Sequence, residues 1–329
     1  MDGSIMPTRM LLDIEDLTVR FVTREATVHA VNGVNLQVQA GEVLCILGES
    51  GSGKSVTLRA LMRLLPAGRT RIEGRITLDG QDVLSLDRKR LQAMRGGLVS
   101  MIFQEPMTAL DPVYTVGAQI IETVRQHRGG SQRDARARAL ELFELVKIPS
   151  PERRLDAYPH ELSGGLRQRA MIAMALSCAP KLLLADEPTT ALDATVQIQV
   201  LILLRRLQRE MGMGTIFVTH DLGVASEIAD RIAVMYAGRI VESGSCAAVI
   251  NTASHPYTKG LLASRGHARM GKNDRLKAIP GSPPDLSAPP PGCAFGPRCE
   301  SFVESCADQV PPSVAIEVGH EARCIRLLA

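Results

Sequence analysis

One glycine-rich run constrains the fold of this chain more than any other feature: Gly48, Glu49, Ser50, Gly51, Ser52, Gly53, Lys54 and Ser55, followed by Val56. It matches the pattern G-x-x-x-x-G-K-S, with an apolar strand candidate before it and a helical pattern after it. Backbone N–H groups at such a helix start attract phosphate. In this pattern Lys54 reaches the β- and γ-phosphates and Ser55 holds Mg²⁺. A flexible Gly/Ser turn is the alternative, but it would not require the full pattern in this context.

Between Leu11 and about Gly244, short apolar runs alternate with helical patterns. The runs typical of strands buried on both faces are Val43–Leu47, Val99–Phe103, Leu182–Ala185 and Thr215–Thr219. The helical patterns include Val56–Leu65, Arg133–Val146 and Ala194–Leu207. Alternating patterns, typical of a small antiparallel sheet, cover Leu12–Phe21, Val34–Val38 and Arg75–Leu78. We therefore predict an α/β fold with a mainly parallel core sheet and an antiparallel β part beside it.

Two acidic residues, Asp186 and Glu187, follow the apolar run Leu182–Ala185. At the carboxyl end of a parallel strand, Asp186 is expected beside the phosphate loop, where it would help to hold Mg²⁺. Glu187 would polarise an attacking water. Without the phosphate loop, such a pair is usually a solvated strand end.

The composition excludes several classes of protein. With 45% hydrophobic residues the chain can form a core, and a net charge of +3 with 3% aromatic residues disfavours a nucleic-acid binder. No apolar run reaches the roughly 18 residues needed to span a bilayer, and Met1–Met10 lacks the pattern of a signal peptide. We therefore expect a cytosolic location, where thiols stay reduced.

The seven cysteines are unevenly placed. Cys45, Cys178 and Cys246 are scattered, and we expect them to be packing residues. After His255 helical periodicity disappears and prolines accumulate, which predicts an extended linker into a tail with four cysteines: Cys293, Cys299, Cys306 and Cys324. Four thiolates can hold an iron–sulfur cluster or Zn²⁺, but neither the paired C-x2-C spacing of zinc sites nor a ferredoxin-like run is present. Unliganded thiols are the third possibility.

The segment Leu162–Arg169, with Ser163, Gly164 and Gly165, resembles the signature motif of ATP-binding cassette (ABC) ATPases, although Leu166 stands where many of them have Gln. The chain order also resembles that family: phosphate loop, Gln104, signature, Asp186-Glu187, Asp193 and His220. The segments Met101–Pro112 and His255–Thr258, and the cysteine tail, are similar to the ATPase subunits of bacterial dipeptide and oligopeptide importers. This resemblance covers essentially the whole chain.

The resemblance implies a P-loop ABC ATPase domain over residues 1–250, with a helical subdomain at about 105–178. It also implies a Pro-rich, four-cysteine C-terminal extension over 251–329. ATP and Mg²⁺ are the implied cofactors, together with a [4Fe-4S] cluster on the four tail cysteines. Gln104 would contact Mg²⁺ or its water, and His220 would contact the γ-phosphate.

Ser163, Gly164 and Gly165 would form a second phosphate site that faces a partner ATPase chain, and Asp193 would cross that dimer seam. Asp193 also suits a helix N-cap, and both roles are compatible. Phe21 is the available adenine-stacking residue near the start of the chain, and a buried strand Phe is the alternative.

The implied function is ATP hydrolysis that drives uptake of di- and oligopeptides, at the cytoplasmic face of the bacterial inner membrane. The implied partners are two permease subunits, one docking near Pro106–Asp111, a second ATPase chain (related or identical) and, indirectly, a solute-binding protein. Nickel complexes and glutathione remain alternative cargoes. A soluble ABC ATPase acting on DNA or ribosomes would have long coiled coils or two cassettes in one chain, and the sequence shows neither; a basic stripe for nucleic acid is missing as well. A redox or metal sensor is a third possible function, and the four-cysteine tail is the feature that supports it.

Overall fold

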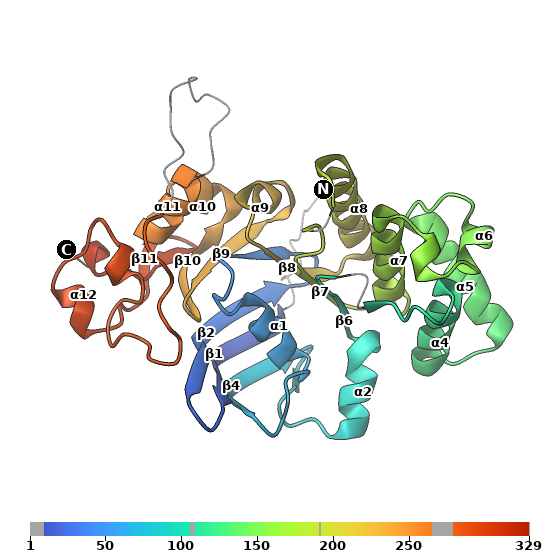
Figure 1. Ribbon diagram of the computed structural model, residues 1–329, viewed down its shortest axis with the longest axis horizontal. Coiled ribbons are helices and arrows are strands. Elements are labelled where there is room, and N and C mark those ends of the chain that lie inside the picture. The colour runs from blue at the N-terminus through green and yellow to red at the C-terminus, as the bar shows by residue number, and fades with distance from the viewer. Residues whose placement is uncertain (1–9, 106–108, 191, 265–278, 329) are drawn as a thin grey trace, which may run out of the picture. The chain divides into compact units, whose positions relative to one another are not determined.

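The computed structural model describes residues 10–105, 109–190, 192–264 and 279–328 (Figure 1). The chain forms two compact units. Unit 1 consists of Met1–Leu11, Val38–Glu42 and Leu78–Val218, and unit 2 of Leu12–Gln37, Val43–Thr77 and Thr219–Ala329. The units do not follow the predicted division at residue 250, since unit 2 combines the phosphate loop with the C-terminal residues. The division into an ATPase domain and an extension stays a prediction.

Unit 2 contains the small sheet predicted for the N-terminal part. Its strands β1 (Met10–Val22), β2 (Thr27–Gln39) and β4 (Thr70–Leu78) lie in the order β2-β1-β4. The N–H of Thr23 donates to the carbonyl of Ala26 at 3.0 Å and closes the turn between β1 and β2. Burial alternates along β1, as expected of a strand with one face in the core.

The second sheet of unit 2 carries the phosphate loop. Its strands lie in the order β11-β12-β10-β9-β3 and are β3 (Val43–Leu47), β9 (Arg231–Tyr236), β10 (Arg239–Ser245), β11 (Val314–Glu317) and β12 (His320–Ala322). β3 pairs with β9 in parallel, and the remaining pairs are antiparallel (Figure 1). β3 is buried at every residue, as its apolar sequence predicts. The C-terminal strands therefore extend the sheet that holds the phosphate loop.

The helices of unit 2 are short. They are α1 (Lys54–Leu61), α9 (Leu222–Ile228), α10 (Cys246–Asn251), α11 (Pro256–Ser264) and α12 (Ser305–Asp308), with 3-10 turns η2 (Gly296–Arg298) and η3 (Ile325–Leu327). The prediction that helical structure ends after His255 is wrong, because α11 begins at the next residue. Proline is tolerated in the first helical turn, and Tyr257 and Thr258 in that turn are fully buried. Residues 279–292, by contrast, form no helix or strand.

Unit 1 contains three parallel strands and the helices that pack with them. β6 (Val99–Ile102), β7 (Leu182–Asp186) and β8 (Gly214–Thr219) pair in the order β6-β7-β8, and every residue in them is buried. Unit 1 also contains β5 (Gln81–Asp82), α2 (Arg88–Gly97) and α8 (Ala194–Met211). These strands confirm the predicted buried runs except at Phe103, which lies after β6 and is exposed.

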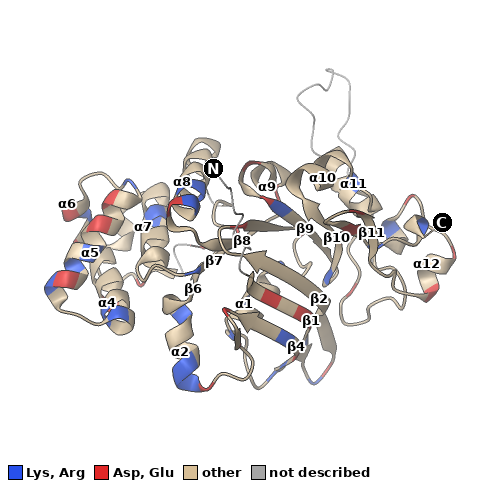
Figure 2. Cartoon of the chain, turned by 180° about the vertical axis from the view of Figure 1, so that it is seen from behind, with Lys and Arg blue, Asp and Glu red and all other residues tan. Residues whose placement is uncertain are grey.

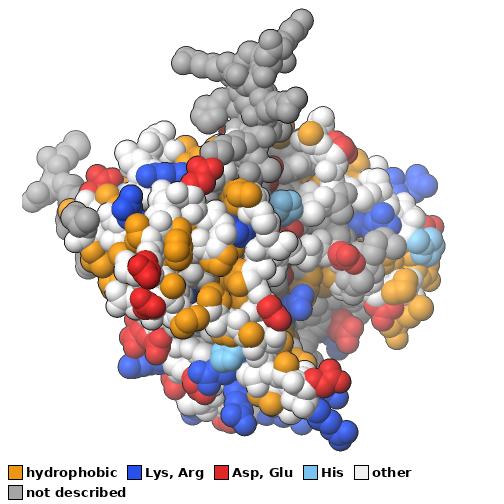
Figure 3. Space-filling model, turned by 60° about the vertical axis from the view of Figure 1, so that its left-hand side comes forward, with side chains coloured by type: hydrophobic (Ala, Val, Ile, Leu, Met, Phe, Trp, Pro, Cys, Tyr) orange, Lys and Arg blue, Asp and Glu red, His pale blue; other side chains and the backbone are white. Residues whose placement is uncertain are grey.

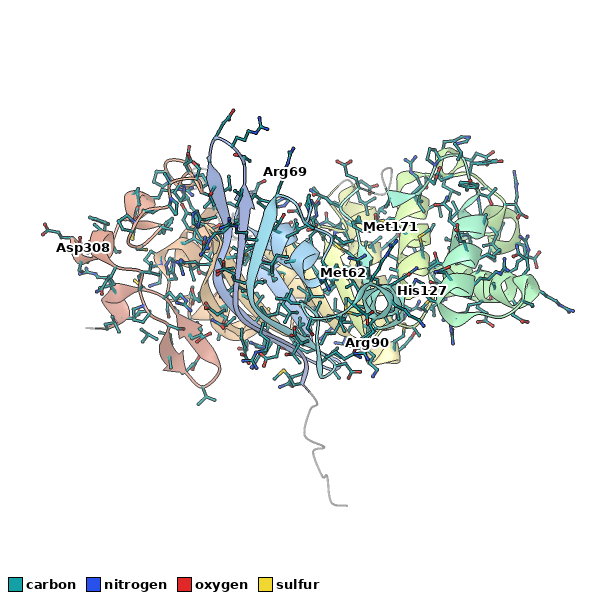
Figure 4. All side chains as sticks on the ribbon, turned by 90° about the horizontal axis from the view of Figure 1, so that it is seen from below. Met62, Arg69, Arg90, His127, Met171 and Asp308 are labelled. Carbon is teal, nitrogen blue, oxygen red and sulfur yellow. The ribbon has the colours of Figure 1, made fainter. Side chains whose placement is uncertain are left out.

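Helices α4 (Val116–Arg128), α5 (Gln132–Leu145), α6 (Pro151–Leu155) and α7 (Gly164–Leu176) gather in unit 1, with the turn η1 (Pro159–Glu161) before α7 (Figure 1). Their buried faces include Ile120, Leu142 and Phe143. Figure 4 labels His127 and Met171 in this helical part. A Cβ at Gly96 of α2 would lie 2.7 Å from Nε2 of His127, so glycine permits this close packing of α2 against α4.

Acidic and basic residues are interspersed along the elements of both units (Figure 2). On the face that carries α12, hydrophobic side chains lie among charged ones (Figure 3). Among the helices of the described residues, none combines the length and apolar character required to cross a membrane.

Candidate nucleotide-binding site

The phosphate loop runs from β3 to the start of α1, as the sequence predicts. Gly51 and Gly53 have φ angles of 78° and 103°, in the region that favours glycine. A Cβ at Gly53 would collide with the carbonyl oxygen of Ala30, and one at Gly48 with the carbonyl oxygen of Met235. The pattern thus places glycine where the backbone turns and where other segments of the same chain approach the loop closely.

Lys54 is the first residue of α1 and is 4% exposed. Its Nζ donates to the carbonyl oxygens of Gly48 and Glu49, both at 2.8 Å. The ammonium group therefore lies within the concavity of the loop. A phosphate oxygen there would meet this charge together with the backbone N–H groups that open α1.

Three residues beside the phosphate loop were not identified from the sequence. The hydroxyl of Tyr257 accepts a hydrogen bond from the N–H of Glu49 at 2.9 Å. Arg298 donates to both carboxylate oxygens of Glu49 and to the hydroxyl of Tyr236. The sequence features nearest to these residues are the His255–Thr258 segment, which contains Tyr257, and Cys299, which follows Arg298. Neither feature indicates a contact with the phosphate loop.

In unit 1, Asp186 ends β7 and is 1% exposed. Glu187 follows with φ of 46°, and its N–H donates to the carbonyl of Val218 at 3.0 Å. Nε2 of Gln104 donates to Oε2 of Glu187 at 3.4 Å, and Oγ1 of Thr190 donates to the same oxygen at 3.0 Å. The structure thus brings together two of the three predicted catalytic side chains.

The signature segment begins a helix, as predicted. Ser163 is the N-cap of α7 and accepts a hydrogen bond from the N–H of Leu166 at 3.4 Å. Gly164 and Gly165 form the first turn, so their N–H groups lie at the positive end of the helix. A Cβ at Gly165 would lie 2.9 Å from Val196, which accounts for the small residue there.

Asp193 is the N-cap of α8, and its carboxylate accepts hydrogen bonds from the N–H groups of Thr195 and Val196. The N-cap prediction is therefore confirmed, and the role of Asp193 at a dimer seam stays a prediction. His220 is exposed between β8 and α9, and Phe21 is half-buried near the end of β1. Their contacts with nucleotide likewise stay predictions.

All seven cysteines are free thiols. Cys45 is fully buried in β3, and burial raises the pKa of its thiol, which keeps it neutral. This agrees with a packing role. Cys178 and Cys246 are half-buried.

The four tail cysteines lie near one another in unit 2. Burial raises the pKa of Cys293, and the thiols of Cys306 and Cys299 raise it further. Burial also raises the pKa of Cys299, with added contributions from Cys324 and Cys306. The N–H of Cys293 donates to the carbonyl of Cys306 at 2.7 Å. In the described part of the chain, however, no group of three or more His, Cys, Asp or Glu side chains is arranged to hold a metal ion.

Two family models match this sequence. The model described as ABC transporter matches residues 31–190, from β2 to just past Glu187. The model described as oligopeptide/dipeptide transporter, C-terminal region, matches residues 241–306. The second match includes Tyr257 and Arg298.

Similar proteins agree with these matches. A putative peptide import ATP-binding protein of Brucella abortus (strain 2308) is 50% identical over 98% of this chain and 98% of its own length. The oligopeptide transport ATP-binding protein OppD of Bacillus subtilis (strain 168) is 48% identical over 94% of this chain and 87% of its own. Among solved structures, the dimeric post-hydrolysis state of the ATP-binding cassette MJ0796 bound to ADP and Pi is 31% identical. It has a TM-score of 0.64 and covers 72% of this chain and 99% of its own.

The strand-loop-helix phosphate motif, the signature at a helix start and the pairing of Gln104 with Glu187 all agree with these similarities. The chain belongs to the ABC transporter family of ATP-binding proteins and carries the C-terminal region of its oligopeptide/dipeptide transporters.

Proposed function

We propose that this chain binds and hydrolyses ATP as the nucleotide-binding subunit of an importer of di- and oligopeptides. The phosphate loop between β3 and α1, with Lys54 buried in its concavity, carries this proposal. The full-length similarity to proteins named peptide import and oligopeptide transport ATP-binding proteins supports the choice of cargo.

Each predicted site residue has a role in the proposal. Lys54 and the loop N–H groups of residues 48–56 bind the phosphates. Ser55, Gln104 and Asp186 provide hydroxyl, amide and carboxylate oxygens, which are the ligands that Mg²⁺ prefers. When bound, Mg²⁺ offsets negative charge on the phosphates. Glu187 orients and polarises the attacking water, and His220 contacts the γ-phosphate.

A partner ATPase chain completes the proposed site. Ser163, Gly164 and Gly165 present backbone N–H groups at a helix start, which suits the phosphates of a nucleotide held by the partner. Asp193 would lie at the same seam, and Phe21 would stack on adenine. The dimeric MJ0796 structure with ADP and Pi supports a two-chain arrangement. We propose a related second chain here rather than an identical one.

The remaining partners would be two permease subunits and, indirectly, a solute-binding protein, with the chain at the cytoplasmic face of the inner membrane. The proposed permease seat at Pro106–Asp111 falls in part on residues 106–108, which lie outside the described residues.

The test of the chemistry is ATP turnover by the reconstituted importer carrying Glu187→Gln. Because the amide is a far weaker base than the carboxylate, turnover at this site should fall about 100-fold or more, with ATP binding retained. Glu152→Gln, on the exposed surface of α6, is the matched control and should leave turnover unchanged. If Glu187→Gln turned over ATP as fast as the wild type, Glu187 would not be the residue that polarises the attacking water.

We also propose that residues 251–329 form a Pro-rich extension in which Cys293, Cys299, Cys306 and Cys324 hold a [4Fe-4S] cluster. The donor type suits this group, because the four cysteines are free thiols and thiolates are the ligands of such clusters. In the described residues these thiols are not arranged to hold a metal ion, so the proposal rests on the four cysteines themselves and on the resemblance to peptide-importer subunits. When bound, the cluster would crosslink the segments that carry the four cysteines.

The cluster is tested by absorbance, iron and acid-labile sulfide in protein purified without oxygen. Cys306→Ser should lower the iron content, whereas Cys178→Ser in unit 1 should not. A colourless wild-type protein that contains zinc and no iron would contradict the cluster.

A further inference from the structure

Three groups of Glu49, the second residue of the phosphate loop, have bonding partners in unit 2. Its N–H donates to the hydroxyl of Tyr257, and its carbonyl oxygen accepts from Nζ of Lys54. Its carboxylate accepts from Nη1 and Nη2 of Arg298 at 2.8 and 3.1 Å. Two of these partners, Tyr257 and Arg298, belong to the oligopeptide/dipeptide C-terminal region and lie beyond residues 31–190.

Arg298 is buried in its pair with Glu49, whereas Glu49 keeps some contact with water. The side chain of Arg298 is 5% exposed and that of Glu49 is 26% exposed. The hydrogen bonds that Arg298 donates to Glu49 raise the pKa of its guanidinium, although burial lowers it. A two-pronged bond of this kind fixes the orientation of the carboxylate as well as its position.

Arg298 is itself held in place. Its Nε donates to the carbonyl of Pro280 at 2.8 Å, and its Nη1 lies 3.2 Å from the hydroxyl of Tyr236. The guanidinium carbon lies 5.8 Å from the ring centre of Tyr236 and 6.0 Å from that of Phe295. The rings of Tyr236, Tyr257 and Phe295 also contact one another. These contacts fix the position of the Arg298 side chain. Through its bonds to Glu49, Arg298 can therefore restrict the motion of the phosphate loop.

We propose that Arg298 is a positioning residue of the nucleotide site, which fixes the Glu49 end of the phosphate loop in the shape that receives the phosphates. This inference rests on the proposed nucleotide site. A loop that is ordered before binding loses less conformational entropy when ATP binds. Since Arg298 contacts the loop and not the reacting groups, its removal should weaken ATP affinity and leave the chemical step unchanged.

The test measures binding of a fluorescent ATP analogue with Mg²⁺ to the full-length chain, and ATP turnover by the reconstituted importer. Arg298→Met should raise Kd about tenfold, the effect expected for loss of a charge-assisted hydrogen bond. Arg298→Lys should raise it about threefold, because lysine keeps the charge without the planar fork. In both variants kcat at saturating ATP should match that of the wild type, and only KM should rise.

A double-mutant cycle with Glu49→Gln tests the contact itself. If Arg298 acts through Glu49, the double variant should bind no more weakly than Arg298→Met alone. Arg136→Met is the matched control, because Arg136 makes a similar two-pronged bond to Asp156, at 2.9 and 2.9 Å, outside the phosphate loop. Its Kd should equal that of the wild type.

The outcomes separate this role from the nucleotide site itself. An unchanged Kd in Arg298→Met and Arg298→Lys, or a fall in kcat without a rise in KM, would overturn the positioning role alone. Absence of ATP binding by the wild type, or equal binding by Lys54→Ala, would overturn the nucleotide site and the positioning role together. If Arg298→Met does not fold, the Kd and KM of Arg298→Lys decide the question.

Discussion

At the scale of single residues, the glycines of the phosphate loop differ in what surrounds them. Gly53 combines φ of 103° with the close approach of Ala30 and Met235, whereas no other group lies within 4 Å of a Cβ built at Gly51. Gly53→Ala should therefore cost several kcal/mol and abolish ATP binding, since both backbone and neighbours must move. Gly51→Ala should cost about 1–2 kcal/mol, from the left-handed backbone alone.

The comparison uses urea unfolding and ATP titration of the two alanine variants. Equal stability loss in both would show that packing around Gly53 does not constrain the loop.

His255 gives the protein a pH-dependent stability. Burial, with a smaller effect of Lys259, lowers the pKa of His255 to about 4, and its Nδ1 accepts a hydrogen bond from the N–H of Tyr257. In the unfolded chain the pKa of His255 is near 6.5. Between pH 6.5 and 4 this side chain therefore binds more protons in the unfolded chain than in the folded one. The stabilisation is therefore complete above pH 6.5 and is lost as the pH falls toward 4, by about 3 kcal/mol in all.

Urea unfolding at pH 7.5 and 4.5 measures this effect. His255→Gln should flatten the difference between the two pH values, and His160→Gln, an exposed side chain, should not. A pH dependence in His255→Gln equal to that of the wild type would contradict the assignment.

At the scale of elements, Glu242 links β10 to the start of α11 and to β12. Its carboxylate, fully buried, accepts from the N–H groups of Ser254 and His255, just before α11, and lies 2.8 Å from Nε2 of His320 on β12. Glu242→Ala would leave these donors, of which those of His255 and His320 are buried, without an acceptor and should lower the free energy of unfolding by about 3 kcal/mol.

The control is Glu321→Ala on β12, an exposed residue that accepts from the hydroxyls of Ser243 and Ser313. It should cost less than about 1 kcal/mol, because water can replace an exposed carboxylate. Equal losses in urea unfolding of the two variants would show that Glu242 does not join the elements.

The elements that sequence predicts well are those set by local pattern. β3 matches its predicted range, and β6 and β7 match theirs to within one residue, because a short run buried on both faces is mostly apolar. The helix α11 was not predicted, because the proline-rich linker was extended back to His255, although a proline fits the first helical turn.

At the scale of the whole molecule, the phosphate-loop conformation was predictable and its anchor was not. Gly53 and Lys54 occupy positions that a contiguous motif defines, so spacing alone indicates their geometry. The contact of Glu49 with Arg298 joins residues 249 positions apart, and no local periodicity specifies such a pair. Tertiary contacts of this kind depend on how β9, α11 and the C-terminal residues pack in unit 2.

The pairing of β12 with β10 has a consequence for shortened forms of the chain. β10 already pairs with β9 on one side, so without β12 its other side would expose unpaired N–H and C=O groups. An open strand edge is a template for pairing with another chain. Among the described residues the edge lies instead on β11, a four-residue strand with a register shift and an exposed Glu317. We therefore expect the C-terminal strands to keep this sheet from pairing with another chain, and a chain ending near residue 250 to associate with itself through β10.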